Sequence, residues 1–171
     1  MSDNYQELVE VRKSAELLHD EGIMRATYDD LADQISDSLA DSRPLLLPVM
    51  LGGLYLCGQL MSRLDFPLEI DYLHATRYGD KLHGEDLYWR ASPSDKILGR
   101  SVLLIDDILD QGITLSGIIG SLKMAGAEDI QSVVLCCKQC TRPVEVDVTF
   151  KGVNVPCLLY TSDAADDSIR V

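Results

Sequence analysis

Three acidic residues stand close together near the middle of the chain, and a glycine and a threonine follow them. Asp106 and Asp107 are neighbours, and Asp110 precedes Gly112 and Thr114. Adjacent carboxylates can accept hydrogen bonds from a sugar diol or hold Mg²⁺ through its water molecules. Asp110, at the start of the glycine loop, can exchange a proton with a group that reacts above the sugar. These residue types in this order predict a site for a sugar diol or for a magnesium ion.

The residues after Asp110 form a candidate phosphate-binding loop, Gln111, Gly112, Ile113 and Thr114. Thr114 stands where a helix is expected to begin, because the apolar residues after it recur at helical spacing. The first N–H groups of a helix have no partner within it, and the helix dipole adds partial positive charge, so a phosphate binds well there. A less specific interpretation is a strand–turn–helix unit whose acids are solvated and cap the helix. Capping explains one acid but not three.

The element that positions these groups is a short apolar run at residues 102–105, which reads as a buried strand that ends at the acid pair. In open α/β sheets, ligands bind at the carboxyl ends of the strands. The run therefore predicts an α/β protein with its site at that edge of the sheet.

This segment resembles the phosphoribosyl pyrophosphate signature of the type I phosphoribosyltransferases: an apolar strand, two acids, two apolar residues, an acid, then x-Gly-x-Thr. The resemblance implies that Asp106 and Asp107 contact the ribose hydroxyls, and that residues 110–114 bind the 5′-phosphate. It also implies the fold of that family, a mostly parallel twisted sheet flanked by helices, with a flexible hairpin hood. The phosphoribosyltransferase domain is expected to cover residues 1–156.

Several other segments are expected to build this sheet and its helices. Apolar spacing predicts a first helix over residues 5–18, ended by Glu21 and Gly22, and a loose capping box at residues 27–30 opens a second. Strands are expected over the apolar runs, and a helix follows the first of them. The expected strands are residues 44–51, 68–78, 87–91, 130–137 and 144–155, and the helix is residues 54–64.

A double glycine, Gly52 and Gly53, follows the first of these strands directly. It permits positive φ and a close approach of a ligand to the backbone, although a tight turn explains it equally well. It resembles the pyrophosphate loop of the family, with Leu51 and Gly52 as the contacting residues. Relatives often have a basic residue at the position of Leu51, so backbone amides would bind the pyrophosphate here.

Lys138 follows an apolar strand and is expected to be an exposed donor at the same sheet edge as Asp106. It resembles the lysine that donates to O6 of the base in the 6-oxopurine branch of the family; a strand-end lysine that reaches solvent is the alternative. The polar loop at residues 79–84 would form the tip of the hood, with Arg77 and Tyr78 near its root, although an ordinary surface hairpin is nearly as consistent with these residues.

The chain has 171 residues and a formal net charge of −13, which speaks against a nucleic-acid or membrane-surface role. It has no leader sequence or long apolar stretch, so a cytoplasmic location is expected. Five cysteines fit reduced thiols better than a disulfide framework, and Cys137 and Cys140 lack the second pair that a zinc site needs.

The last segment, residues 157–171, resembles one reading frame of the transposase adapter used to build sequencing libraries. It is interpreted as a non-native tail on a C-terminally truncated domain, and no site role is assigned to it. A short, acidic, native tail is the alternative.

The resemblance implies purine salvage: transfer of the 5-phosphoribosyl group from phosphoribosyl pyrophosphate to hypoxanthine or guanine, giving IMP or GMP and pyrophosphate. Asp110 would be the catalytic residue, Mg²⁺ the cofactor, and a homodimer or homotetramer the assembly. Two alternatives stay open, namely a preference for xanthine and a non-catalytic regulator that binds phosphoribosyl pyrophosphate. A basic face would be expected of a regulator that binds nucleic acid.

Overall fold

The structure is a computed structural model, and it describes residues 15–77, 87–92 and 95–157, together with Gln6, Val9, Glu10 and Lys13. The predictions for Tyr78, for the tip of the hood and for the tail beyond Cys157 lie outside the described residues. No described helix is long and apolar enough to cross a membrane.

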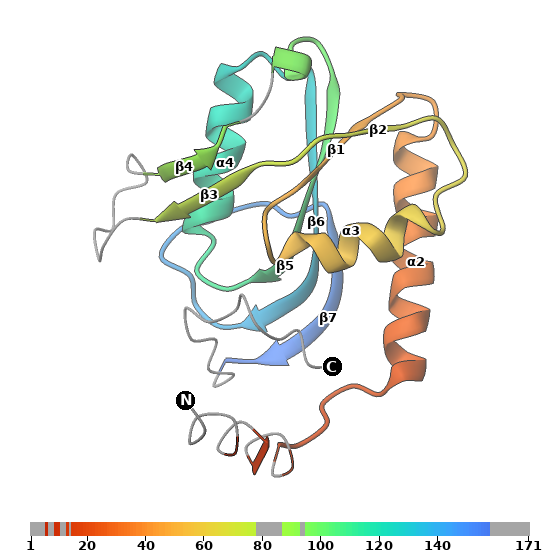
Figure 1. Cartoon of the computed structure of the whole chain (residues 1–171), viewed down its shortest axis with the longest axis vertical. Coiled ribbons are helices and arrows are strands. Elements are labelled where there is room, and N and C mark those ends of the chain that lie inside the picture. The colour runs from red at the N-terminus through yellow and green to blue at the C-terminus, as the bar shows by residue number, and fades with distance from the viewer. Residues whose placement is uncertain are drawn as a thin grey trace.

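Five parallel strands form the central sheet, in the order β2-β1-β5-β6-β7 (Figure 1). Their bounds are β1 (Leu45–Pro48), β2 (Glu69–Ile70), β5 (Ser101–Leu109), β6 (Asp129–Gln139) and β7 (Phe150–Pro156). The centre of the sheet is buried on both faces, which explains why β1 and β5 read as continuous apolar runs instead of alternating ones.

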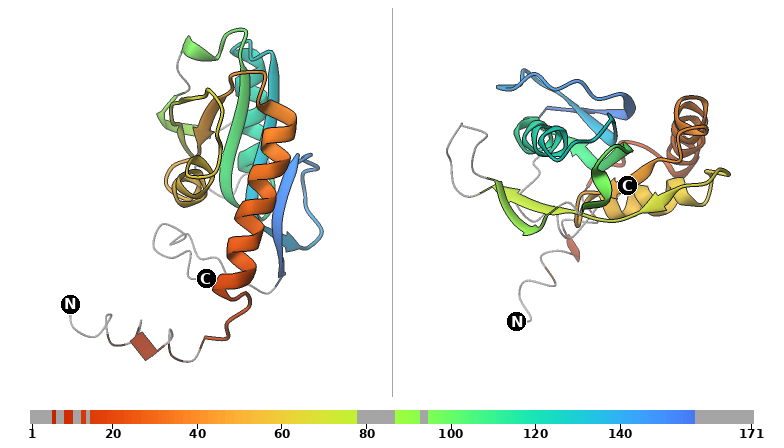
Figure 2. Two further views of the ribbon diagram at one scale, coloured as in Figure 1. Left: turned by 90° about the vertical axis from the view of Figure 1, so that its right-hand side faces the viewer. Right: turned by 90° about the horizontal axis from the view of Figure 1, so that it is seen from above.

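Helices cover both faces of the sheet, as Figure 2 shows from above. They are α2 (Glu21–Leu39), α3 (Gly53–Met61) and α4 (Ile113–Met124), with a short 3-10 helix at Asp95–Ile97. Side chains of β5 alternate between two cores: Leu103 and Ile105 pack with α2 and α3, whereas Leu104 packs with α4. The sheet is therefore the shared middle layer of three.

A separate antiparallel hairpin pairs β3 (His74–Arg77) with β4 (Leu87–Ala91) and packs on the α4 side of the sheet. The prediction of β4 is confirmed. The single strand expected over residues 68–78 is wrong, because the chain pairs with β1 at β2, leaves the sheet after an isolated bridge at Leu73, and enters the hairpin as β3.

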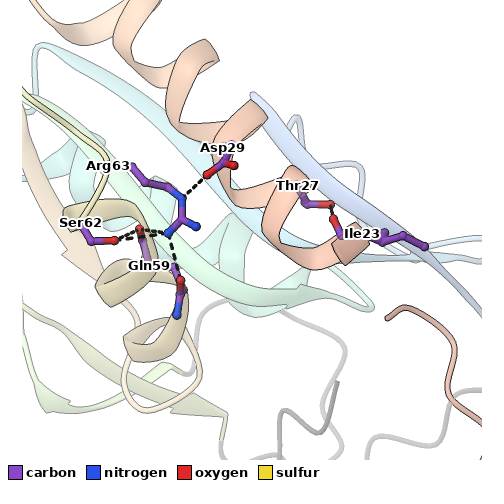
Figure 3. Close-up of polar contacts among 6 residues, drawn as sticks. All are labelled: Ile23, Thr27, Asp29, Gln59, Ser62 and Arg63. Atoms are coloured by element: carbon purple, nitrogen blue, oxygen red, sulfur yellow. Dashed lines mark hydrogen bonds and ion pairs between the residues drawn. The ribbon is translucent and has the colours of Figure 1, made fainter. Parts of the chain in front are cut away.

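The N-terminal predictions need correction. Glu21 and Gly22 do not end a helix but begin α2, which Asp20 caps by accepting a hydrogen bond from the Ile23 amide at 2.8 Å. Thr27 does not cap a helix, because its hydroxyl donates to the Ile23 carbonyl one turn back at 2.9 Å (Figure 3). Residues 15–20 are not helical, so the first helix does not extend to residue 18.

One arginine joins the two helices on the same face of the sheet. The Arg63 guanidinium, just after α3, donates to the Asp29 carboxylate of α2 at 2.6 Å and to the Gln59 carbonyl at 2.9 Å (Figure 3). It also lies over the Tyr28 ring, 5.3 Å from the ring centroid. These contacts fix α3, whose first residues border the candidate site, against α2.

Candidate active site

The strand that carries the acid pair is longer than the sequence indicated. β5 runs through Asp106 and Asp107 to Leu109, and Asp106 still pairs with Val134 of β6. The prediction that the strand ends at the acids is wrong, because the parallel ladder continues on their backbones. Successive side chains in a strand point to opposite faces, so Asp107 shares the α3 face with Ile105 and Asp106 lies on the other.

Asp106 is a buried carboxyl whose ionised form is disfavoured by its surroundings. Burial raises the pKa of its carboxyl well above the ordinary value, and the neighbouring Asp107 carboxylate raises it further. The amide of Asp107 donates to Asp106 Oδ1 at 3.0 Å and favours the ionised form, without reversing the shift. A bound cation or a sugar hydroxyl near this pair would relieve the repulsion.

The loop between β1 and α3 lies directly against Asp107. A Cβ on Gly52 would stand 2.6 Å from the Asp107 Cγ, and a Cβ on Gly53 would stand 2.2 Å from the Ile105 carbonyl oxygen. Gly52 has a φ of −54°, so the expectation of positive φ is wrong, and close approach is the reason for glycine here. The Met50–Leu51 peptide bond is cis, and Leu51 is exposed. The structure thus brings Gly52, which directly follows Leu51, against Asp107.

The candidate phosphate loop turns from β5 into α4. Gly112 has a φ of 78°, a left-handed conformation that favours glycine, and its carbonyl accepts the first helical hydrogen bond from Ser116 at 2.9 Å. α4 begins at Ile113, so Thr114 is the second residue of the helix and not the residue before it. Gln111 is exposed and Ile113 is buried. The N–H groups of the first helical turn therefore end at this loop, as a phosphate site requires.

Asp110 and Lys138 form an ion pair, with Lys138 Nζ 3.1 Å from Asp110 Oδ2. The register of the sheet explains it: Leu109 pairs with Cys137, so the next residue of each strand lies beside the other. The prediction of an exposed lysine at a strand end is wrong. β6 continues to Gln139, and Lys138 is only 6% exposed.

Arg142 is a residue of this site that the sequence did not indicate. Its guanidinium donates to the carbonyls of Asp110 and Lys138, the first at 2.9 Å. No sequence motif distinguishes Arg142, since it follows β6 in an irregular segment. Among the described residues, no group of three or more His, Cys, Asp or Glu side chains could hold a metal ion. A magnesium ion here would take carboxylate, water and substrate oxygens, which is how Mg²⁺ is usually bound.

The family model for the phosphoribosyl transferase domain matches residues 14–161. The chain belongs to this family. The prediction of a type I phosphoribosyltransferase with a mostly parallel sheet is confirmed, and the signature residues 106–114 lie within the matched part.

Curated relatives of this phosphoribosyltransferase chain share about a quarter of its residues. The hypoxanthine-guanine phosphoribosyltransferase of Bacillus subtilis is 27% identical over 141 residues, which cover 82% of this chain and 78% of that protein. The hypoxanthine-guanine-xanthine phosphoribosyltransferase of Tritrichomonas foetus is 26% identical over 140 residues, covering 82% and 72%.

Solved structures share the fold. A hypoxanthine-guanine phosphoribosyltransferase from Bacillus anthracis superposes with a TM-score of 0.78 at 22% identity, covering 83% of this chain and 84% of that one. A hypoxanthine phosphoribosyltransferase from Staphylococcus aureus gives 0.76 at 23% identity, covering 82% and 78%. At these identities the likeness establishes the phosphoribosyltransferase fold alone.

Proposed function

We propose that this protein transfers the 5-phosphoribosyl group from phosphoribosyl pyrophosphate to hypoxanthine or guanine. The bond from ribose C1′ to the pyrophosphate oxygen breaks, and a bond from C1′ to a ring nitrogen of the purine forms. The base loses one ring proton, and pyrophosphate leaves. The relatives named for this activity support the assignment, although each is only about a quarter identical.

The observation that carries the proposal is the pair formed by Asp110 and Lys138, 3.1 Å apart at the carboxyl ends of β5 and β6. A 6-oxopurine has a ring N–H beside an oxo group on one edge. A carboxylate accepts the ring proton and an ammonium donates to the oxo group, so the adjacent pair complements that edge. The pair also lies directly before the phosphate loop at Gly112, where the 5′-phosphate would bind.

The remaining residues have positioning roles in this proposal. Asp106 and Asp107 bind the ribose hydroxyls, and the backbone at Leu51 and Gly52 binds the pyrophosphate. Gly52 lies against Asp107. The ribose hydroxyls and the pyrophosphate, which lie on either side of C1′, are therefore bound by two segments that are in contact with each other. Holding two reactants in this way lowers a barrier by up to ~7–11 kcal/mol.

A magnesium ion fits the donor set of this site. Asp106 and Asp107 supply two carboxylates from adjacent residues of β5, and they would hold the ion through water. The ion would neutralise the pyrophosphate leaving group. The raised pKa of Asp106 is consistent with a position that is completed by a cation.

The test supplies the purified protein with phosphoribosyl pyrophosphate and Mg²⁺, and separately with hypoxanthine, guanine, xanthine, adenine or orotate. Chromatography of the nucleotide products is expected to show IMP and GMP, and nothing from adenine or orotate. XMP at a comparable rate would favour the xanthine alternative, to which the Tritrichomonas relative gives some support. Calorimetric binding of phosphoribosyl pyrophosphate without any product would instead favour the non-catalytic regulator, and absence of both would contradict the proposal.

We also propose a homodimer or homotetramer. Large apolar side chains are exposed on α3 and directly before it, which supports a subunit contact there. They are Leu51, Leu54, Tyr55 and Met61, each between 46% and 52% exposed. Light scattering during gel filtration is expected to give a multiple of 18.9 kDa, and a mass equal to that of one chain would contradict the proposal.

A cytoplasmic location is proposed as well. The four cysteines of the phosphoribosyltransferase domain are all free, and thiols persist in a reducing compartment. Fractionation of the source cells with an antibody to the protein tests this, and recovery from the secreted fraction would contradict it.

A further inference from the structure

The connection from β6 to β7 is unusual for two adjacent parallel strands, because residues 140–149 contain no helix. Such crossovers usually contain one. This connecting segment instead starts directly after Gln139, the last residue of β6 that pairs with β7, and passes beside the turn from β5 into α4. It thus lies against both strands that carry the proposed base contacts.

Arg142, in the connecting segment, bonds to backbone atoms of both strands at once. Its Nε donates to the Asp110 carbonyl at 2.9 Å, and its Nη2 donates to the Leu109 carbonyl at 3.4 Å. The same Nη2 donates to the Lys138 carbonyl and lies 3.4 Å from the Cys137 sulfur. One planar guanidinium therefore spans the ends of β5 and β6 and bonds to the carbonyls of both residues of the Asp110–Lys138 pair.

A second contact fixes the connecting segment in place. A Cβ on Gly112 would stand 2.8 Å from Val146 Cγ1 and 3.3 Å from the Val144 carbonyl oxygen. The segment is thus packed against the phosphate loop two residues beyond Asp110. Val148, at its far end, is buried in the core on the α4 side of the sheet. These contacts hold the backbone of the segment that carries Arg142 beside the strand ends.

We infer that Arg142 is a positioning residue that sets the geometry of the Asp110–Lys138 pair for the purine. The inference rests on the proposed function, in which that pair contacts the base. The side chains of Asp110 and Lys138 are joined by one ion pair, but the carbonyls of both residues are joined through Arg142. When a base separates the two side chains, the guanidinium still holds their backbones at a fixed spacing. A lysine could not do this, because a single ammonium lacks the rigid fork of donors.

The first test compares Arg142→Lys and Arg142→Gln with the unmodified protein. We expect the kcat/KM for the base to fall about 10–100-fold in both, as for a displacement of catalytic groups by an ångström. The dissociation constant of phosphoribosyl pyrophosphate should change by less than about threefold, because its proposed contacts are elsewhere. Arg100→Lys is the matched control: Arg100 also donates to a carbonyl, that of Arg43 at 3.0 Å, but lies at the opposite end of β5. Its kinetic constants should be unchanged.

The second test does not depend on activity. The coupling between Asp110→Asn and Lys138→Gln is measured by denaturant unfolding, once with Arg142 present and once with Arg142→Lys. The coupling is the factor by which the unfolding constant of the double variant departs from the product of the two single effects. We expect this factor to fall toward one when Arg142 is replaced. Retained coupling together with unchanged kcat/KM would overturn the inference.

These outcomes separate the inference from the proposed function. If the unmodified protein forms no nucleotide from any base, the function is overturned, and the coupling measurement still decides whether Arg142 sets the pair. If the unmodified protein is active and Arg142→Lys matches it in both tests, only the inference fails. A parallel loss of base and phosphoribosyl pyrophosphate binding would show general damage to the site and would also contradict it.

Discussion

Two acids of the signature, Asp107 and Asp110, have different surroundings, and their roles should separate in kinetics. Asp107 lies against the Gly52 backbone, whereas Asp110 lies against Lys138. We expect Asp107→Asn to weaken phosphoribosyl pyrophosphate binding about 10-fold or more, the usual effect of losing a charged hydrogen bond. Asp110→Asn should leave that binding nearly unchanged and lower kcat about 10²–10⁴-fold.

Steady-state kinetics and calorimetry on both variants check this division. Asp41→Asn is the control, since Asp41 is exposed in the turn after α2, and neither parameter should change. Equal losses of binding and turnover in both signature variants would contradict the division.

Asp106 should make the folded protein less stable at neutral pH. Its pKa is raised in the folded chain by burial and by Asp107, so as pH rises the unfolded chain loses this proton first. Stability therefore falls as pH rises from the ordinary pKa of the group to the folded value, and the whole penalty is present above the folded pKa. We expect Asp106→Asn to raise the free energy of unfolding by about 0.5–2 kcal/mol at neutral pH.

The gain should disappear in acid, below both pKa values, because the carboxyl is then protonated in both states. Urea unfolding at pH values on either side of the transition measures the difference. An equal gain at all pH values would show that the charge of Asp106 is not its cause.

The sequence singles out the acids proposed for the site, but their contacts could not be predicted from it. Asp106, Asp107 and Asp110 stand out because no capping role accounts for three acids in five residues. The ion pair to Lys138 depends on the register of β5 against β6, and a local pattern does not fix the register of two strands separated by a helix. Arg142 was missed for the same reason, since its partners are backbone atoms of those two strands.

At the scale of the elements, α3 offers a comparison between two of its glycines. A Cβ on Gly53 would lie 2.2 Å from the Ile105 carbonyl oxygen, whereas a Cβ on Gly58 would meet nothing within 4 Å. We expect Gly53→Ala to cost about 1–3 kcal/mol of stability, because two backbones must separate. Gly58→Ala should stabilise the protein by about 0.5–1 kcal/mol, because it restrains the unfolded chain.

Thermal and urea unfolding of both variants provide the measurement. Gly53→Ala should also weaken phosphoribosyl pyrophosphate binding, since it pushes the adjacent Gly52 away from Asp107. Similar stabilities for the two variants would mean that the close contact between α3 and β5 is not formed.

Element types were easier to predict than element limits. The apolar runs correctly indicated the cores of β1, β5 and β6, because buried strands need such residues whatever surrounds them. The predicted first and last residues of the elements were wrong where two local sequence signals competed. Thr27 resembles a cap but bonds back within α2, and the true cap, Asp20, follows a segment that reads as helical. The expected strand over residues 144–155 is only β7, because its first half is the connecting segment.

At the scale of the whole molecule, the shared sheet should make unfolding a single transition. Leu103 and Leu104 are adjacent and fully buried, but they point into different cores. We expect Leu103→Ala and Leu104→Ala each to lower the free energy of unfolding by about 2–5 kcal/mol. Each substitution should lower the midpoint of the same single unfolding transition, because neither core is complete without β5.

Circular dichroism and tryptophan fluorescence measure this together. Trp89 lies on the α4 side, so its fluorescence follows that core, whereas circular dichroism follows all helices. If Leu104→Ala separates the fluorescence transition from the circular dichroism transition, the two cores are independent.

The ion pair between Asp110 and Lys138 has a consequence for drug design. The two groups already form an ion pair with each other. Each of them therefore competes with any ligand that binds the other. An inhibitor that binds only the carboxylate or only the ammonium must break the ion pair and leave the other charge without a partner. Its affinity is lowered by the free-energy cost of that unpaired charge. A compound that presents a donor and an acceptor side by side replaces both halves at once. Fragment screens against this pair of residues should therefore yield lactam-like hits and miss simple amines and acids.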